Sequence, residues 1–261
     1  MNMLIVIIII FIIAVLMTMT GRGGGNFYVL ALVLAGYSIH RAATTGQFIL
    51  MLTAFSGMII FQKHKLVDWK MAFILDPPTD IMAFAGGYFA EYISGIYLKL
   101  GLAVLLAFAG FIMLIKVKDK LILNHNRFGY WHRKYGDQEY IINLWLAIPM
   151  TSVIGLAAGA VGISGGSFKV PLMVLLCGVP MRIAVGTSSA MVAATALMGF
   201  AGHVTNGGFD AQSAIPIACA AVLGGLLGGK IAIKTKPQGL KKIFAYTTLA
   251  ASIFMVCNAL C

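Results

Sequence analysis

Long uncharged apolar runs dominate this chain. The first, Met3–Thr20, holds no charged side chain, and 60% of the 261 residues are hydrophobic while only 10% are charged. A soluble domain carries about 25% charged residues, so this inventory cannot cover a surface that faces water. Runs of about 20 residues match the thickness of a bilayer. The sequence therefore predicts an all-α integral membrane protein embedded in the lipid bilayer.

The charged residues are mostly basic. Lys and Arg number 19 against 8 Asp and Glu, for a formal net charge of +11. In a membrane protein, basic residues that accumulate on cytoplasmic loops explain such an excess, and we expect no binding to nucleic acid. The longest polar stretch is 116–140, with six Lys or Arg. We interpret it as a cytoplasmic linker in a multi-pass protein of the plasma membrane.

A glycine motif occurs twice. Gly21-Arg22-Gly23-Gly24-Gly25-Asn26-Phe27 recurs 141 residues later as Gly162-Ile163-Ser164-Gly165-Gly166-Ser167-Phe168. After one inserted residue the register continues, and Asp68 meets Asp210 at an offset of 142. A constant register over about 60 residues, a charged side chain included, predicts an internal duplication.

The duplication divides the chain into a first repeat at 1–115, the linker at 116–140 and a second repeat at 141–261. The first apolar run lacks a preceding Lys or Arg and has a counterpart in the second repeat, so we expect it in the mature fold rather than as a cleaved signal. The second segment of each repeat has only about ten residues, too few for a helix to cross about 30 Å of hydrocarbon. The five apolar segments per repeat are Met3–Thr20, Phe27–Gly36, Ala42–Phe61, Trp69–Ser94 and Leu100–Ile115, then Ile141–Val161, Phe168–Gly178, Ile183–Gly202, Ala211–Gly229 and Ile243–Leu260.

Loop charges orient these segments. If the linker is cytoplasmic, then so are Gln62–Lys70, with three Lys, and Lys230–Lys242, with five basic residues, whereas His203–Asp210 has none. This solution places both termini outside the cytoplasm and gives the repeats opposite orientations. Each glycine-centred pair of segments then begins and ends on one side, as two full spans or as a re-entrant hairpin. The sequence thus predicts inverted repeats with roughly eight to ten membrane segments, whose glycine tips meet near the midplane.

The glycine tips are candidates for an anion site. Glycine permits a left-handed backbone and close approach to a ligand, and non-helical backbone at membrane depth must line protein or water. Asn26 and Ser167 are predicted to cap the short helices, whose N-termini would present N–H groups to a small oxyanion. The alternative is that the glycines serve helix packing, as we expect for Gly224–Gly229. The predicted anion-binding residues at the tips are Gly24, Gly25, Asn26, Gly165, Gly166 and Ser167, with Arg22 and Lys169 as flanking cations.

Hydroxyl and amide groups open the third segment of each repeat. Thr44, Thr45 and Gln47 stand in the first repeat, and Thr187, Ser188 and Ser189 stand in the second. They either bond back to their own helix or donate to the same anion. We include Thr45, Gln47, Thr187 and Ser188 among the predicted binding residues.

Acidic residues inside an apolar segment are rare and suggest function. Asp76, Asp80 and Glu91 lie in the fourth segment of the first repeat, and Asp76-Pro77-Pro78-Thr79-Asp80 is predicted to break its helix. Asp76 and Asp80 are candidates for proton coupling, or they line a loop that reaches water. We find no nucleophile–base pair and no metal spacing, so we expect no enzyme activity, no metal and no cofactor.

These motifs resemble the sulfite exporter TauE/SafE family of anion permeases. The second repeat carries the resemblance best, through Gly155–Gly166, Phe168 and Pro171-Leu172, and then through Thr187-Ser188 and His203 to Asp210. In the first repeat Gly21–Phe27 and Asp68-Trp69 fit, while Leu30 stands where the family has proline. The resemblance implies export or uptake of sulfur-containing anions such as sulfite or sulfonates, for example sulfoacetate.

We therefore expect a secondary transporter of small organosulfur anions that works by alternating access, compatible with a homodimer. A carboxylate permease or an anion channel is the alternative within transport. A membrane assembly protein, which uses its small-residue helices to bind partners, is the alternative from another class.

Overall fold

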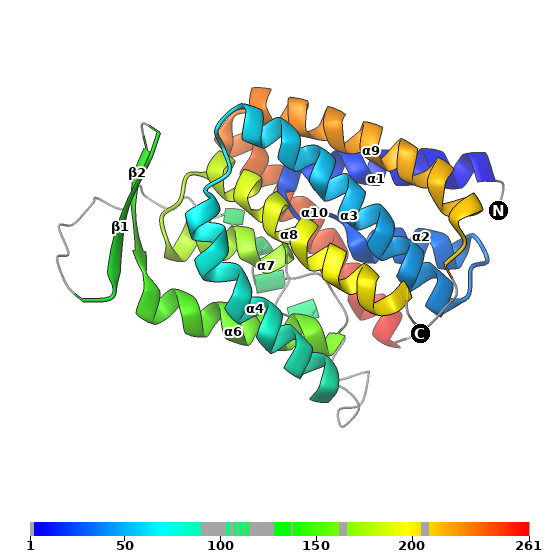
Figure 1. Ribbon diagram of the computed structural model, residues 1–261, viewed down its shortest axis with the longest axis horizontal. Helices are drawn as coiled ribbons and strands as arrows, with labels where there is room; N and C mark the ends of the chain where they lie inside the picture. The colour runs from blue at the N-terminus through cyan, green and yellow to red at the C-terminus, as the bar shows by residue number, and fades with distance from the viewer. Residues whose placement is uncertain are drawn as a thin grey trace. The chain divides into compact units, whose positions relative to one another are not determined.

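The computed structural model describes residues 3–89, 103–104, 107–108, 110–111, 113–114, 128–136, 138–161, 166–204 and 209–260. These residues are mostly helical, and Figure 1 shows their order along the chain. The elements are α1 (Met3–Thr20), α2 (Gly25–Leu34), α3 (Ile39–Lys63), α4 (Trp69–Phe89), β1 (Tyr130–Tyr135), β2 (Gln138–Asn143), α6 (Leu144–Val161), α7 (Gly166–Pro171), the π-helical turn η2 (Leu172–Leu176), α8 (Met181–Val204), α9 (Ala211–Lys234) and α10 (Pro237–Leu260).

The chain forms two compact units. Unit 1 comprises residues 1–67 and 185–235, and unit 2 comprises residues 68–184 and 236–261. Neither unit coincides with a predicted repeat, because each takes helices from both. The repeats are defined by matching positions in the sequence, whereas the units are defined by contacts between residues. The contacts do not test the repeats, so the division into repeats stays a prediction.

Unit 1 is built around α9, which packs against α1 and α3. Glycines on α9 allow this approach: a Cβ added at Gly228 would lie 2.4 Å from the Val15 carbonyl oxygen of α1, and one at Gly225 would lie 2.1 Å from Ser56 Oγ of α3. Such small-residue contacts are typical of membrane helices. The helix-packing role expected for Gly224–Gly229 therefore holds for these positions.

In unit 2, α4 packs along α6, and a Cβ added at Gly155 would lie 2.2 Å from the Thr79 carbonyl oxygen. A two-stranded antiparallel hairpin precedes α6. Strands β1 and β2 pair Tyr130 with Asn143 at one end and Tyr135 with Gln138 at the turn. Helix α6 begins at the residue after β2, so the hairpin is continuous with it (Figure 1).

The hairpin corrects two predictions. The chain is not purely helical, and the predicted segment Ile141–Val161 begins as a strand, so that its helix begins only at Leu144. Aromatic and β-branched residues in both strands favour this pairing over helix: Tyr130, Trp131 and Tyr135 in β1, and Tyr140, Ile141 and Ile142 in β2. A third correction concerns α4, which runs through Pro77 and Pro78 without ending. The prolines deprive only the Phe73 and Ile74 carbonyls of helical donors, and packing along α6 maintains the helix on both sides of them.

Helix boundaries repeat with the sequence register. Helices α1 and α6 begin and end 141 residues apart, as do the starts of α2 and α7, while the starts of α3 and α8 and of α4 and α9 are 142 residues apart. The packing repeats as well, since the first helix of each repeat lies against the fourth helix of the other: α1 on α9 in unit 1, and α6 on α4 in unit 2. This pattern is what a duplication would produce.

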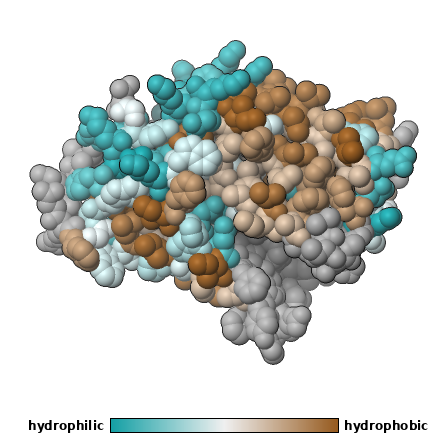
Figure 2. Space-filling model, in the orientation of Figure 1, coloured by the Kyte–Doolittle hydropathy of each residue, from teal (hydrophilic) through white to brown (hydrophobic). Residues whose placement is uncertain are grey.

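Four described helices are long and apolar enough to cross a membrane: Met3–Thr20, Arg41–Lys63, Met181–Ala201 and Ala211–Lys234. Apolar side chains gather over the helices of unit 1 on the face that Figure 2 shows. The exposed large side chains of unit 1 include Phe55, Ile215 and Leu223, each at least half exposed. Apolar exposure on this scale is expected of a surface that faces lipid rather than water.

Candidate functional site

The first glycine motif forms a tight turn between α1 and α2. Gly21, Gly23 and Gly24 have φ of 69°, 76° and 80°, a left-handed backbone that residues with a Cβ rarely adopt. The turn is tied to the end of α1, where the Arg22 amide donates to the Met17 carbonyl over 3.2 Å. Helix α2 begins at Gly25 with Gly24 as its N-cap residue. The prediction that Asn26 caps α2 is therefore wrong, because the left-handed glycines complete the turn earlier and Asn26 is already helical.

Neighbouring helices hold this turn closely. The Ser188 hydroxyl of α8 donates to the Gly21 carbonyl over 2.7 Å, although 167 residues separate the two in the chain. A Cβ added at Gly23 would lie 2.4 Å from Leu50 of α3 and 2.5 Å from Val192 of α8, and one at Gly24 would lie 2.6 Å from Met17. The first tip is thus packed against α1, α3 and α8 within unit 1.

Unit 1 also buries most of the predicted polar residues. Arg22 is 3% exposed, although it lies among apolar helices. Ser189 donates to the Val185 carbonyl of its own helix, which is the back-bonding alternative given above, whereas Ser188 donates to the Gly21 carbonyl of the first tip. Thr45, Thr187 and Ser188 are at most 1% exposed, and Gln47 lies against Gly199. The predicted residues that belong to unit 1 are Arg22, Gly24, Gly25, Asn26, Thr45, Gln47, Thr187 and Ser188.

The second glycine motif belongs to unit 2. Gly166 opens α7, so Ser167 is a helical residue and not the cap that the sequence suggested. After six residues the helix continues as η2, and together they form the short second segment that the sequence predicts. Gly165 lies outside the described residues, and so do the side chains of Asn26 and Ser167.

A buried ion pair joins α7 to α4. Lys169 Nζ donates to Asp76 Oδ1, with the Lys169 side chain 2% exposed and that of Asp76 13% exposed. The sequence predicted that Lys169 adds positive charge to an anion site, whereas the structure shows a carboxylate already paired with it. Asp80 lies one turn along α4 and is partly buried, while Glu91 lies outside the described residues.

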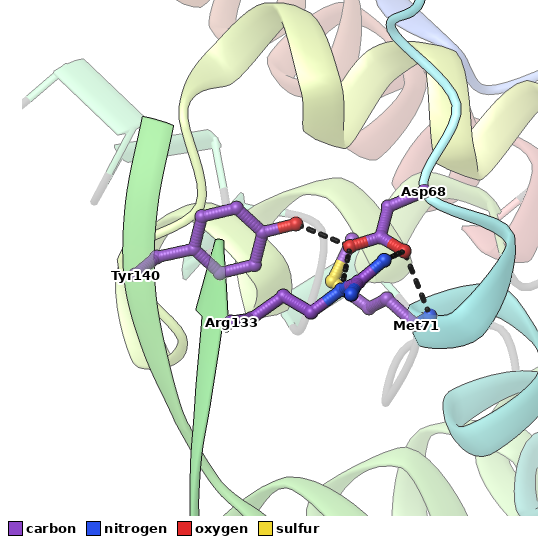
Figure 3. Close-up of polar contacts among 4 residues, drawn as sticks. All are labelled: Asp68, Met71, Arg133 and Tyr140. Atoms are coloured by element: carbon purple, nitrogen blue, oxygen red, sulfur yellow. Dashed lines mark hydrogen bonds and ion pairs between the residues drawn. The ribbon is translucent and has the colours of Figure 1, made fainter. Parts of the chain in front are cut away.

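A second charged cluster, missed by the sequence analysis, holds the start of α4 (Figure 3). Arg133 of β1 donates from Nε and Nη2 to the two Asp68 carboxylate oxygens, each over 2.8 Å. The Tyr140 hydroxyl of β2 donates over 2.5 Å, and the Met71 amide donates over 3.3 Å. Arg133 and Tyr140 face each other in the hairpin register. The available signal was a Gly136-Asp137 turn between two runs with aromatic and β-branched residues.

The environment of Asp68 keeps it ionised. Burial alone would raise the pKa of the Asp68 carboxyl, but hydrogen bonds from Arg133, Tyr140 and the Met71 amide outweigh it and hold the pKa below its ordinary value. Burial, and then the carboxylate that accepts its proton, raises the pKa of Tyr140. The cluster therefore clamps the polar hairpin to the first turn of α4 over a wide pH range.

The apolar helices and their small-residue contacts are those of a polytopic membrane protein. The chain belongs to the sulfite exporter TauE/SafE family, whose sequence profile matches residues 6–255. The family resemblance noted from the motifs is thereby confirmed.

Similar proteins carry transporter names. "Probable membrane transporter protein YunE" of Bacillus subtilis (strain 168) is 24% identical over 206 residues, which cover 77% of this chain and 75% of the relative. "Probable membrane transporter protein YdhB" of the same strain is 23% identical over 239 residues, or 90% of this chain and 92% of the relative. A "Probable membrane transporter protein" of Xylella fastidiosa (strain 9a5c) is 22% identical over 240 residues. No solved structure gives a significant match.

Proposed function

We propose that this chain is a secondary transporter of small organosulfur anions, such as sulfite or sulfonates, and that it works by alternating access. The observation that carries the proposal is Arg22, a buried cation in a left-handed glycine turn within unit 1. A charged side chain among apolar membrane helices is costly and is retained mainly where it serves function. The description of the family as sulfite exporters supports sulfur-containing anions as the substrate class.

The proposed binding chemistry combines one cation with neutral donors. The first turn of a helix leaves N–H groups that no helical carbonyl accepts, and the first turn of α2 follows directly from the glycine turn. Thr45 and Thr187 place hydroxyl groups in the same unit, and the Ser188 hydroxyl, which donates to the Gly21 carbonyl, lies at the turn itself. An oxyanion that reached this turn would find charge and directional donors together. Neutral donors lower the affinity enough for the anion to leave again, which transport requires.

Flux into proteoliposomes tests the function. Purified full-length protein should move sulfite and sulfoacetate in a saturable manner, with counter-transport of one anion by the other. Flux that does not saturate would indicate an anion channel, and preference for simple carboxylates would indicate a carboxylate permease. Stable folded protein with no flux of any of these anions would contradict transport and favour an assembly role.

Arg22→Gln tests the site. We expect it to abolish the rise in melting temperature that sulfite or sulfoacetate gives to the wild type, because binding to the folded state alone stabilises it. Arg41→Gln is the matched control, since Arg41 is an exposed arginine in α3 of the same unit. Equal anion stabilisation in the Arg22 variant and the wild type would move the site elsewhere. Bulky residues at Gly24 are a poor test, because a Cβ there already meets Met17.

A further inference from the structure

The ion pair between Asp76 and Lys169 lies wholly within unit 2 and is separated by 93 residues in the chain. It joins the middle of α4, next to Pro77 and Pro78, to a short helix that begins in the second glycine motif. Lys169 follows Gly166 by three residues, one turn of helix. A cation that a glycine motif places in an anion transporter is a candidate ligand, yet a carboxylate of the protein occupies it here.

Few other charged groups lie near Asp76 that could compensate for a change in its ionisation. Of the described groups that face Asp76, Lys169 comes from α7 and Asp80 from α4 itself. Helix α6, which packs along α4, carries no titratable side chain between Leu144 and Val161. Asp68 lies eight residues earlier, about 12 Å along the helix, and Arg133 and Tyr140 already bind it.

An anion that took Lys169 as its partner would leave Asp76 as a buried carboxylate beside Asp80. Two such negative groups in a poorly solvated site strongly favour uptake of a proton by one of them. The ion pair is neutral, and it stays neutral after a monovalent anion and one proton are both added. With a divalent anion such as sulfoacetate, the proton limits the added charge to one negative unit instead of two. The proton passes from water to an Asp76 carboxylate oxygen, and Lys169 remains an ammonium throughout.

We propose that Asp76 and the transported anion compete for Lys169, so that each anion binds together with one proton taken up by Asp76. The proposal rests on the proposed transport function and names its coupling ion. When no anion is bound, the Asp76 carboxylate pairs with Lys169 in place of the substrate.

The pH dependence of anion binding tests the coupling. Sulfoacetate is the probe, because its charge does not change between pH 6 and 8, and binding is followed by the rise in melting temperature of the full-length protein. Over the range in which Asp76 is ionised, we expect the apparent affinity of the wild type to fall tenfold for each pH unit. Asp76→Asn mimics the protonated carboxyl and should bind sulfoacetate with an affinity independent of pH.

Further variants separate this role from a structural one. Asp76→Asn/Lys169→Met removes both charges, so the fold keeps no unpaired ion, and it should lose sulfoacetate binding. Glu139→Gln, which removes an exposed carboxylate of the hairpin, should keep the pH profile of the wild type. An Asp76→Asn profile as steep as that of the wild type, a flat profile in Asp80→Asn instead, or full binding by the double variant would each overturn the proposal.

A proteoliposome assay distinguishes this proposal from the function on which it rests. A trapped pH indicator should report one proton entering with each sulfoacetate in the wild type and none in Asp76→Asn. If the wild type moves no anion, the proposed function fails. If it moves sulfoacetate without protons, the transport function stands and the coupling proposal is wrong.

Discussion

Asp68 and Asp210 occupy equivalent positions in the two predicted repeats, and their environments differ sharply. Each immediately precedes the fourth helix of its predicted repeat and accepts a hydrogen bond from a backbone amide of that helix, Asp68 from Met71 and Asp210 from Gln212. Asp68 is fully buried and also binds Arg133 and Tyr140, whereas Asp210 is partly exposed and has only local partners from its own helix among its described hydrogen bonds.

The difference originates in the linker, which the chain contains only once. Arg133 and Tyr140 come from the hairpin between the repeats, so only one of the two capping aspartates can acquire them. Both predicted repeats have an aspartate that caps the fourth helix. Only in the first does this aspartate also bind Arg133 and Tyr140. The two predicted repeats thus differ at this position although the starts of their fourth helices keep the same offset.

The largest expected effect is the difference in stability between variants that lack the Asp68 carboxylate and variants that lack the Asp210 carboxylate. Asp68→Ala leaves Arg133 and Tyr140 without their acceptor. We expect a loss of about 3 kcal/mol, toward the lower end of the cost of breaking a buried ion pair, because Arg133 keeps some exposure. Asp210→Ala removes only a cap and should lower the melting temperature far less. Thermal unfolding in detergent measures both, and equal shifts would show that the clamp adds nothing to the cap.

A methyl group added at the α4–α6 contact should destabilise the protein as much as one added at the α1–α9 contact. Gly155→Ala forces a methyl group against the Thr79 carbonyl, and Gly228→Ala forces one against the Val15 carbonyl. We expect each to destabilise the protein by about 2 kcal/mol, as overpacking does. Gly229→Ala is the control on the same helix, because the three atoms nearest to its added Cβ belong to the Ile60 side chain, at 3.1 Å or more, and not to backbone. If only one member of the pair responds, the two interfaces are not equivalent.

Tyr140→Phe should make Asp68 more like Asp210. It removes one donor to the carboxylate while Arg133 and the Met71 amide remain. The expected loss is about 1.5 kcal/mol, typical of a hydrogen bond to a charged group. The same thermal assay measures it, and Tyr130→Phe on the neighbouring strand serves as control. An unchanged melting temperature would place the strength of the clamp in the arginine alone.

The smallest expected effect is that of pH. Because the pKa of Asp68 is lowered in the folded state, its contribution to stability is complete above the unfolded value of about 4 and is lost as pH falls through the folded pKa. The raised pKa of Tyr140 acts in the opposite range, so its contribution declines above about pH 10. The stability difference between wild type and Asp68→Asn should therefore be constant between these limits. A decline near pH 6 would mean that another group titrates in the clamp.

The sequence register predicted local structure well. Matching of the glycine motifs and of Asp68 with Asp210 anticipated helix starts that the structure repeats at the same offsets. The short helices after the glycine motifs were also predicted, from the length of the apolar runs that follow each motif. These features depend on residues close together in the chain, where glycine conformation and apolar run length decide the outcome.

Pairing between distant segments could not be predicted in the same way. Membrane helices are apolar on all sides, so their pattern does not say which helix packs on which, and the two interleaved units were not anticipated. Arg133 and Tyr140 stand 65 and 72 residues from Asp68 in a polar stretch that is typical of a linker. The binding roles of Arg22, Ser188 and the other proposed residues, Gly165 included, stay predictions until anion binding is measured.

The interleaving of the two units imposes an order on biosynthesis. Gly21 leaves the ribosome 167 residues before Ser188, the side chain that donates to its carbonyl. At 5–20 residues per second, the first three helices wait about 10–30 s in the bilayer before α8 and α9 arrive to complete unit 1. During that interval the glycine turn and Arg22 need temporary partners, which water, lipid head groups or the insertion machinery can supply. A chain cut after the first repeat should therefore insert its helices yet remain a substrate for quality control.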